Sequence, residues 1–276
     1  MARPIRYGNI KPPPGAQIDW GHPLAQGLVY ATLCDSPRPF DYVNNRHPFS
    51  VIDIAHTIGS DATSIIGTSN LRRVVTHVPK VASWSGTPIT LAAHARLFYL
   101  GVSTYPRIIM LNTTQGSGDC VVLRIQNAGR QSIAIEWIGS VNMIRESIAL
   151  DFSQPVTFTA VGTHAGGANY SSANIYYQGL NVNDDSASQN GSGLYQSDGN
   201  IILMNSYAQD RPFDGAIYCA MVWNRVFTSD EARWWSNEPY SMFYYEPPVV
   251  YSIPSLGGGS KSSAKIYIAG SASVLH

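Results

Sequence analysis

The chain alternates short apolar runs with clusters of turn-forming residues. Val, Ile, Leu and aromatic residues make up the runs, and Gly, Asn, Asp and Pro separate them, which is typical of strands joined by turns. We predict strands at Gly27–Leu33, Ser50–Ile54, Arg73–Val78, Ile89–Leu97, Arg107–Asn112, Cys120–Ile125, Ser132–Trp137, Val156–Thr163, Asn174–Gln178, Asn200–Asn205 and Gly215–Trp223. Many short strands without long helical periodicity favour an all-β sandwich or barrel.

The last of these strands carries the clearest pattern. Gly215–Trp223 is apolar on both alternating faces, which predicts a strand that is buried on both sides. Asp214 and Gly215 provide a tight turn before it, because glycine accepts positive φ without a steric penalty. Thr228 and Glu231 then have the spacing of a capping box, so we predict one short helix after Thr228.

Aromatic residues follow this helix start closely, with Trp234 and Trp235 first and several rings up to Tyr245. We expect one of the two tryptophans to fold back on the sandwich. The remaining rings exceed what one short helix can bury, so they form a closing strap of the domain. Whether some of them face a neighbouring subunit stays open.

The two ends differ in composition from the middle. Residues 1–19 form an arm, because the proline run from Lys11 to Gly15 cannot join a helix or a central strand. Residues 20–245 form the domain. Residues 246–276 form a second arm, with a flexible Gly-rich joint in its middle.

After this joint the second arm contains a strand-like run, Ala264–Ala269, that has nothing local to pair with. Such a segment beyond a flexible joint is suited to adding itself to the sheet of another chain. The alternative is a tail that is disordered or docks on its own body. We take Trp20, Ile266, Tyr267 and Ile268 as the partner-binding anchors.

Composition excludes some classes of function. The sequence has 18 Lys and Arg against 18 Asp and Glu, and no basic run, which argues against nucleic-acid binding. No apolar stretch reaches the roughly 18 residues of a membrane span, and the start lacks the apolar core of a signal peptide. We therefore expect no membrane insertion, and assembly in a cytoplasm. Only 13% of residues are charged while 16 are Tyr, which suits a permanent interface or sugar contacts.

We predict no catalytic residues and hence no enzyme. Glycosidases place two carboxylates on either side of one bond, and no Glu here has a second carboxylate two or four residues away. The nucleophile elbow, the zinc-binding helix and the phosphate-binding loop are all missing from the sequence. The three cysteines, Cys34, Cys120 and Cys219, lack metal-site spacing and are interpreted as buried free thiols.

Two weaker binding sites remain. Alternation turns either Tyr176 or Tyr177 outward, so an exposed ring is expected that could stack on a sugar, the alternative being rings packed under loops or at an interface. Asn183, Asp184 and Asp185 offer oxygen ligands that suit Ca²⁺, the alternative being an ordinary Asx-rich hairpin loop. No other cofactor is predicted.

Three phrases carry a family resemblance. They are the opening run from Trp20 through His22-Pro23-Leu24-Ala25 to Val29, the strand Val156–Thr163 followed by a strand that ends in the Tyr-x-x-Gly turn Tyr176–Gly179, and Phe213-Asp214-Gly215 with the capped helix. Together they resemble the concanavalin A-like, or laminin G-like, jelly roll in the form found in bacteriophage virion proteins. The resemblance implies an all-β, two-sheet antiparallel jelly-roll sandwich with one short C-terminal helix and extended terminal arms.

The resemblance also implies a function. We expect a bacteriophage virion structural protein, either a capsid decoration protein of the head surface or a tail-associated protein. It would act by assembly through its terminal arms, with other virion proteins and copies of itself as partners, and it would be located in the virion after assembly in the host cytoplasm. The alternative is a carbohydrate-binding adhesin that recognises host surface glycan, since fold does not fix function.

Overall fold

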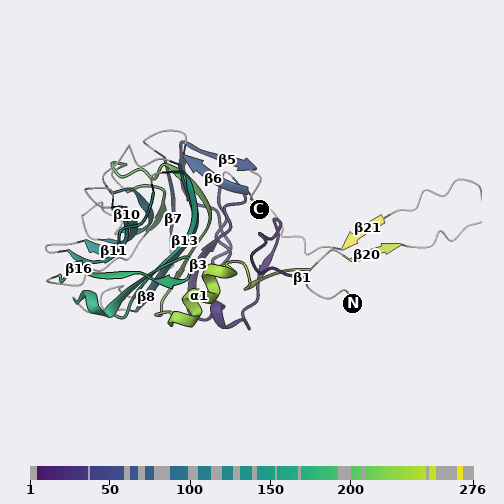
Figure 1. Cartoon of the computed structure of the whole chain (residues 1–276). Helices are drawn as coiled ribbons and strands as arrows, with labels where there is room; N and C mark the ends of the chain where they lie inside the picture. Colours follow the sequence, from purple (N-terminus) through teal and green to yellow (C-terminus); the bar gives the residue numbers. More distant parts are fainter. Residues whose placement is uncertain are drawn as a thin grey trace, which may run out of the picture.

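The computed structural model shows a sandwich of two antiparallel sheets (Figure 1). It describes residues 5–36, 38–58, 63–67, 72–77, 88–98, 105–112, 120–126, 131–138, 142–152, 154–166, 169–191, 200–206, 209–246, 249–252 and 266–269. The fold class that the sequence predicts, an all-β sandwich with one short helix, is confirmed.

We call the two large sheets the front sheet and the back sheet. The front sheet has the strand order β16 (Asn183–Gln189), β12 (Met143–Ser147), β11 (Ser132–Ile138), β10 (Cys120–Gln126), β9 (Arg107–Asn112), β17 (Asn200–Leu203), β7 (Arg73–His77) and β4 (Ser50–Ile52). The back sheet has the order β15 (Leu180–Asn181), β14 (Ala173–Tyr177), β13 (Val156–His164), β8 (Ile89–Leu97), β18 (Gly215–Trp223), β6 (Thr63–Gly67) and β5 (Ile54–Ile58), and β3 (Leu28–Thr32) also pairs with β18.

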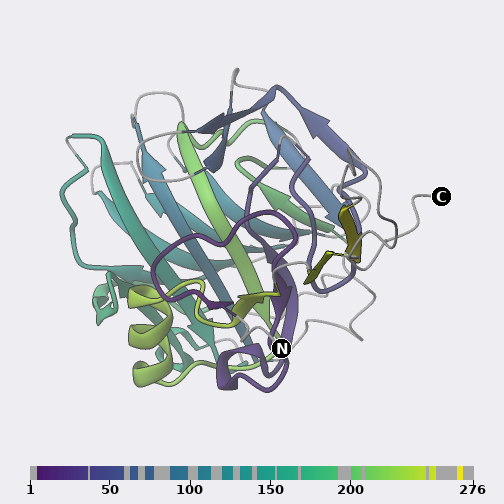
Figure 2. The same cartoon turned by 90° about the vertical axis from the view of Figure 1, so that its right-hand side faces the viewer.

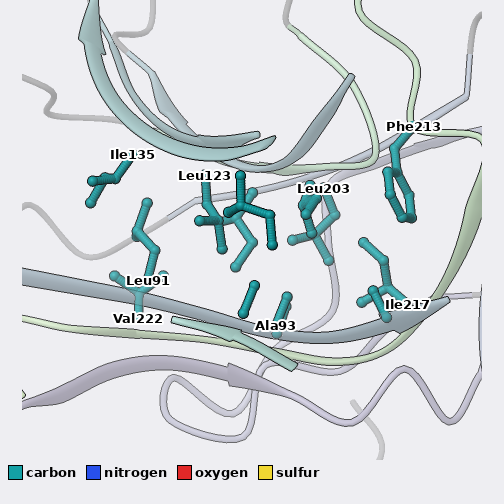
Figure 3. Close-up of a cluster of buried hydrophobic side chains, with 14 of the residues drawn as sticks. Leu91, Ala93, Leu123, Ile135, Leu203, Phe213, Ile217 and Val222 are labelled. Atoms are coloured by element: carbon teal, nitrogen blue, oxygen red, sulfur yellow. The ribbon is translucent and has the colours of Figure 1, made fainter. Parts of the chain in front are cut away.

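The main core lies between the sheets because every second residue of each strand points inward. Figure 3 shows Leu123, Ile135 and Leu203 of the front sheet above Leu91, Ala93, Ile217 and Val222 of the back sheet, with Phe213 at one end. All eight are buried. The strands above the core in Figure 3 curve away from it at both ends, so the outer face of the front sheet is concave.

A second apolar layer covers the outer face of the back sheet. Helix α1 (Ser229–Asn237) and the N-terminal segment lie across this face (Figure 2). Trp223 of β18 and Trp235 of α1 meet edge to face with ring centroids 6.2 Å apart, and both are fully buried. The capping box of Thr228 and Glu231 is confirmed, and so is a β18 strand buried on both faces.

Most predicted strands are confirmed, and three have the predicted bounds: β8, β9 and β18. The prediction of one strand over Ser50–Ile54 is wrong, because Asp53 has a φ of 46° and separates β4 from β5, which belong to different sheets. Strands β6, β12 and β16 of the two large sheets were not predicted, and of β5 only Ile54 lay in a predicted strand. The short strand β15 and those at Ile5–Arg6, Gln17–Ile18, Phe243–Tyr245 and Val249–Ser252 were not predicted either. The predicted turn between β14 and β15 is present, with positive φ at both Gln178 and Gly179.

The N-terminal segment is folded onto its own body, which differs from the expectation of an arm that reaches a neighbour. A third sheet has the order β1 (Ile5–Arg6), β19 (Phe243–Tyr245) and β2 (Gln17–Ile18). Pro12 and Ile18 are buried, and the Lys11 amine donates to the carbonyl oxygen of Tyr218 at 3.1 Å. Burial lowers the pKa of Lys11. The buried side chains of Pro12 and Ile18 therefore hold the N-terminal segment against the sandwich.

The C-terminal strand has a local partner, so the expectation that it has none is wrong. β21 (Ile266–Ala269) pairs antiparallel with β20 (Val249–Ser252), and Tyr267 lies opposite Tyr251. Figure 1 draws this two-stranded sheet away from the sandwich. An isolated two-stranded hairpin is only marginally stable in water. The division of the chain at residues 19 and 245 stays a prediction.

Candidate functional site

The tyrosines predicted as a sugar platform are not exposed. Alternation does turn Tyr176 away from the main core, but α1 covers it, and its hydroxyl lies 3.2 Å from Oγ of Ser229. Tyr177 packs against the main core, where its ring stacks on Phe158 with centroids 6.0 Å apart. The expectation of an exposed ring at this pair is therefore wrong, because the sequence pattern does not show that a helix lies on the outer face.

The residues predicted to bind calcium lie on an edge strand and not in a loop. Asn183, Asp184 and Asp185 begin β16, and their side chains bond to neighbouring protein groups. The amide oxygen of Asn183 accepts from the backbone N–H of Ile175 at 2.7 Å, and Asp185 pairs with Arg145. Among the described residues, no three His, Cys, Asp or Glu side chains form a cluster that could hold a metal ion. Calcium binding here stays a prediction.

Trp20 lies at an exposed turn, where the sequence analysis placed a partner-binding anchor. The backbone N–H of His22 donates to the carbonyl oxygen of Asp19 at 2.9 Å, which closes a β-turn with Trp20 and Gly21 at its centre. The Asp19 carboxylate accepts from the N–H of Gly21 at 3.1 Å and fixes the turn. Trp20 is 56% exposed, which is unusual for so large an apolar ring.

Beside this turn, the paired strands β2 and β19 have one row of side chains that points inward and one row that points outward. β2 and β19 pair with Ile18 opposite Phe243 and Gln17 opposite Tyr244. Ile18 and Phe243 are buried, so alternation turns Gln17 and Tyr244 to the surface. The Tyr244 hydroxyl donates to the Gln17 amide oxygen at 3.0 Å, which fixes the ring against the strand pair.

The loop residues 35–36 and 38–47 form the opposite wall. Its centre is the buried carboxylate of Asp41, which accepts from the backbone N–H groups of Val43 and Asn44 and from the Asn44 side chain. At the surface, the Tyr42 hydroxyl donates to Asp35 at 2.7 Å. Burial and the nearby Asp35 carboxylate raise the pKa of Tyr42, so this hydroxyl keeps its proton and the bond.

The Trp20 turn, the β2–β19 pair and the loop opposite them enclose a groove of about 840 Å³, which we call the Trp20 groove. Its rings are Trp20, Phe40, Tyr42, His47 and Tyr244, and its polar groups include Gln17, Asp35 and Asn45. A second hollow of about 320 Å³ continues on the other side of Trp20 and Tyr244. Flat aromatic faces beside amide and carboxylate groups can stack on sugar rings and bond to sugar hydroxyls.

A different kind of cavity lies on the concave outer face of the front sheet. We call it the sheet-face hollow; it encloses about 350 Å³, and its side chains include Tyr105, Arg107, Arg124, Glu136, Glu146 and Arg211. The strand register places Glu146 opposite Ala134, Ala134 opposite Arg124, and Arg124 opposite Arg107. The methyl group of Ala134 leaves room in the middle of this row, and charged side chains stand at its sides.

Most charged groups of the sheet-face hollow are held by partners. Arg124 forms a short ion pair with Glu136, whose other oxygen accepts from Asn142 at 2.7 Å. The guanidinium carbons of Arg124 and Arg211 lie 4.9 and 5.4 Å from the ring centroid of Tyr105, which is cation–π range. Arg124 and Glu136 are both almost completely buried, so the pair is well ordered.

Sequence reasoning missed this hollow and most of the Trp20 groove. Glu136 and Glu146 are ten positions apart in the chain, and only the β11–β12 pairing brings them to one cavity. Tyr244 was expected in a closing strap and Trp20 as an anchor, but nothing local in the sequence shows that they share a wall. The pairing of β2 with β19 joins them, and it connects residues near the two ends of the domain.

No family model and no curated protein matches this chain. Solved structures do match in fold. The binding domain of Paraclostridial Mosquitocidal Protein 1 aligns with a TM-score of 0.55 and 15% identity, over 78% of this chain and 52% of that chain. Trypanosoma rangeli sialidase in complex with sialic acid has a TM-score of 0.55 and 13% identity, over 77% of this chain and 33% of that chain.

The Botulinum Neurotoxin serotype G binding domain is similar in the same way, with a TM-score of 0.54 and 12% identity, over 75% of this chain and 50% of that chain. The chain therefore spans about half the length of the two toxin domains and about a third of the sialidase. The described part of the chain holds no helix that is long and apolar enough to cross a bilayer. At these identities the comparisons establish a shared jelly-roll type β-sandwich fold.

Proposed function

We propose that this chain is a glycan-binding module whose binding surface is the Trp20 groove. The observation that carries the proposal is the exposed Trp20 ring beside Tyr244 and Tyr42 in a groove that also contains Asp35 and Gln17. An exposed tryptophan has an energetic cost in water, and stacking on the apolar face of a sugar removes that cost. The expected ligand is an oligosaccharide, because the groove volume of about 840 Å³ is larger than one sugar ring fills.

Polar groups of the groove are in place for sugar hydroxyls. One oxygen of Asp35 is taken by Tyr42, and its other oxygen has no partner among the described residues. The Gln17 oxygen is taken by Tyr244, which leaves the Gln17 amide N–H groups as donors. Buried contacts of Asp41 and Phe243 hold the walls of the groove in place. Binding therefore costs little conformational entropy of the protein.

Binding, without turnover, is the activity we expect. The two carboxylates that share the sheet-face hollow are both engaged, Glu136 with Arg124 and Asn142, and Glu146 with the Ser132 hydroxyl at 3.2 Å. The sialidase similarity in fold brings no catalytic residues to this chain, because the identity is 13% and the match covers a third of that protein.

A glycan array with the full chain tests the proposal. Trp20→Ala should weaken binding to every positive glycan at least tenfold, or by about 1.4 kcal/mol, as measured by calorimetric titration. Trp234→Ala is the matched control, because Trp234 is also exposed but lies on α1. An empty array, or equal binding by Trp20→Ala and the native chain, would show that the groove does not bind glycans. Incubated glycans should remain uncleaved.

Assembly on a bacteriophage particle is the second candidate function, and it follows from the family resemblance. The observation that favours it is the β20–β21 hairpin, which Figure 1 draws beyond the sandwich after the closing strand β19. As a virion protein, the chain would present its Trp20 groove to host glycans and attach through residues 246–276. Removing residues 247–276 should then abolish attachment to purified particles and leave glycan binding unchanged. Attachment that survives this deletion would contradict the role of the C-terminal segment.

A further inference from the structure

Among the described residues, Arg107 of the sheet-face hollow has no carboxylate partner at ion-pair distance, although Asp210 lies near enough to interact with it. Arg107 lies directly opposite Arg124 on the neighbouring strand, and like charges in opposite positions of a sheet repel each other. Arg124 has Glu136 as its partner, whereas in the part of the chain that the structure describes the guanidinium of Arg107 donates only to the sulfur of Met110, at 3.0 Å. Sulfur is a weak acceptor.

The Nε–H group of Arg107 is buried without a hydrogen-bond partner among the described residues. A buried donor without a partner costs about 1–3 kcal/mol, and more when it belongs to a charged group. A buried group of this kind needs an explanation, such as a bound ion, a water molecule or a functional role. Because Arg107 also lies opposite a second arginine, an anion is the partner that suits this group best.

A β-bulge gives Arg107 this position. The register between β9 and β10 shifts between Leu123 and Arg124, which leaves Ile108 as the extra residue of β9. Without the shift, Arg107 would share the inward face with Ile109 and Leu111, which are buried in the main core. Bulges of this kind re-aim side chains next to binding sites.

The remaining groups decide the class of the anion. Arg107, Arg124 and Arg211 line the hollow together with Glu136 and Glu146. Asp210 lies 3.7 Å from Arg211 at the edge of the hollow, so the local charge is close to neutral, which suits a monoanion better than a phosphate dianion. A guanidinium fork matches a planar carboxylate with two parallel bonds. The second oxygen of Glu146 and the amide N–H groups of Gln126 have no partner among the described residues, and they suit hydroxyl groups.

We propose that the sheet-face hollow binds an acidic sugar unit, with a carboxylate on Arg107 and Arg211 and ring hydroxyls on Glu146 and Gln126. The volume of about 350 Å³ fits one such unit and not a chain of them. This site is separate from the Trp20 groove: it is formed by the concave face of the front sheet, while the groove is formed by β2, β19 and residues 35–36 and 38–47.

Calorimetric or NMR titration of the full chain with sodium glucuronate, its methyl ester and glucose tests the proposal without any mutation. Glucuronate should bind at least tenfold more tightly than the ester or glucose, because only glucuronate carries the charge that Arg107 lacks. Equal affinity for the three sugars would overturn the proposal. Displacement of glucuronate by equimolar inorganic phosphate would also overturn it, since the site would then be a general anion site.

Variants locate the site. Arg107→Gln should weaken glucuronate binding at least tenfold and Arg107→Lys should weaken it less, whereas Arg233→Gln, an exposed arginine on α1, should leave it unchanged. Trp20→Ala should also leave it unchanged, which separates this site from the glycan groove. Unaltered glucuronate binding by Arg107→Gln would place the ligand elsewhere and refute the assignment.

The ligand-free protein offers an independent readout. Because Arg107 faces Arg124 without an anion, Arg107→Gln should raise the melting temperature of the unliganded chain, and glucuronate should raise the melting temperature of the native chain only. A variant that melts earlier than the native chain would mean that Arg107 has a structural role, and the proposal would fail.

Discussion

Acidification should destabilise this protein through His164, which is completely buried at the end of β13. Its Nδ1 atom accepts a hydrogen bond from the backbone N–H of Gly166 at 2.9 Å, so the neutral ring carries its proton on Nε2, next to the hydroxyl of Ser172 at 3.1 Å. A second proton would have to sit on Nδ1, facing the N–H of Gly166. Burial alone lowers the pKa of His164 from 6.5 to about 4.

The direction of the effect follows from where the proton binds first. The pKa in the folded state lies below that in the unfolded chain, so the unfolded state takes up the proton first. Stability is fully present above pH 6.5, is lost as the pH falls toward 4, and is not lost further by this group below that. Between pH 7 and pH 4.5, the free energy of unfolding should fall by roughly 2 kcal/mol on account of His164, at 1.36 kcal/mol per pKa unit.

The assay is urea unfolding followed by tryptophan fluorescence at pH 7 and pH 4.5, for the native chain and for His164→Gln. A glutamine amide can accept from Gly166 and donate to Ser172 but cannot become charged. Burial also lowers the pKa of His22, but this residue is present in both proteins and cancels in the comparison. The native chain should therefore lose roughly 2 kcal/mol more than the variant between the two pH values. Equal losses would refute the reasoning, and the exposed His47→Gln should behave as the native chain does.

Three further changes test the packing by urea unfolding at pH 7. Thr228→Ala should cost about 1 kcal/mol while Thr228→Ser costs little, because the capping box satisfies the N–H groups of the first helical turn; equal effects would contradict this. Gly162→Ala should cost about 1–3 kcal/mol, because the added methyl would lie 3.0 Å from Cβ of Ile135; an unchanged midpoint would mean that the sheets separate easily. Arg124→Met alone should cost about 3–5 kcal/mol, because it leaves the buried Glu136 without its positive partner. The double variant with Glu136→Leu should recover most of that loss, and additive losses would show that the two side chains are not coupled.

Alternation along the chain predicts the strands well where both faces are apolar or where one face meets the core. The bounds of β8, β9 and β18 agree with the prediction for this reason. The run that begins at Trp20 also has a structural explanation. His22 caps the short turn Pro23–Ala25, and the Trp223 indole N–H donates to the carbonyl oxygen of Leu24 at 2.6 Å. The resemblance that rests on this run therefore concerns a contact that holds the N-terminal segment against β18.

Strands whose residues are mostly polar escape this kind of prediction. β16 carries Asn, Asp and Ser at positions where a strand usually has apolar residues, and it lies at the edge of the front sheet with several exposed side chains. Its stability comes from pairing with β12 and from side-chain bonds such as the one that the Ser186 hydroxyl donates to the Asp184 carboxylate. The same composition is typical of loops, so the sequence cannot distinguish the two.

Functional side chains depend even more on tertiary pairing. Tyr176 follows the alternation rule and still ends up buried, because α1 covers the face to which it points. Arg107 violates the rule and lies in the hollow on the outer face of the front sheet, because one extra residue in β9 reverses the direction of its side chain. A helix-covered face and a bulge leave no trace in the local pattern, since both arise from residues far away in the chain. The charged hollow and the aromatic groove therefore become visible only when the strands are placed beside one another, and an uncompensated arginine at a bulge is the kind of feature that a stable fold retains when binding requires it.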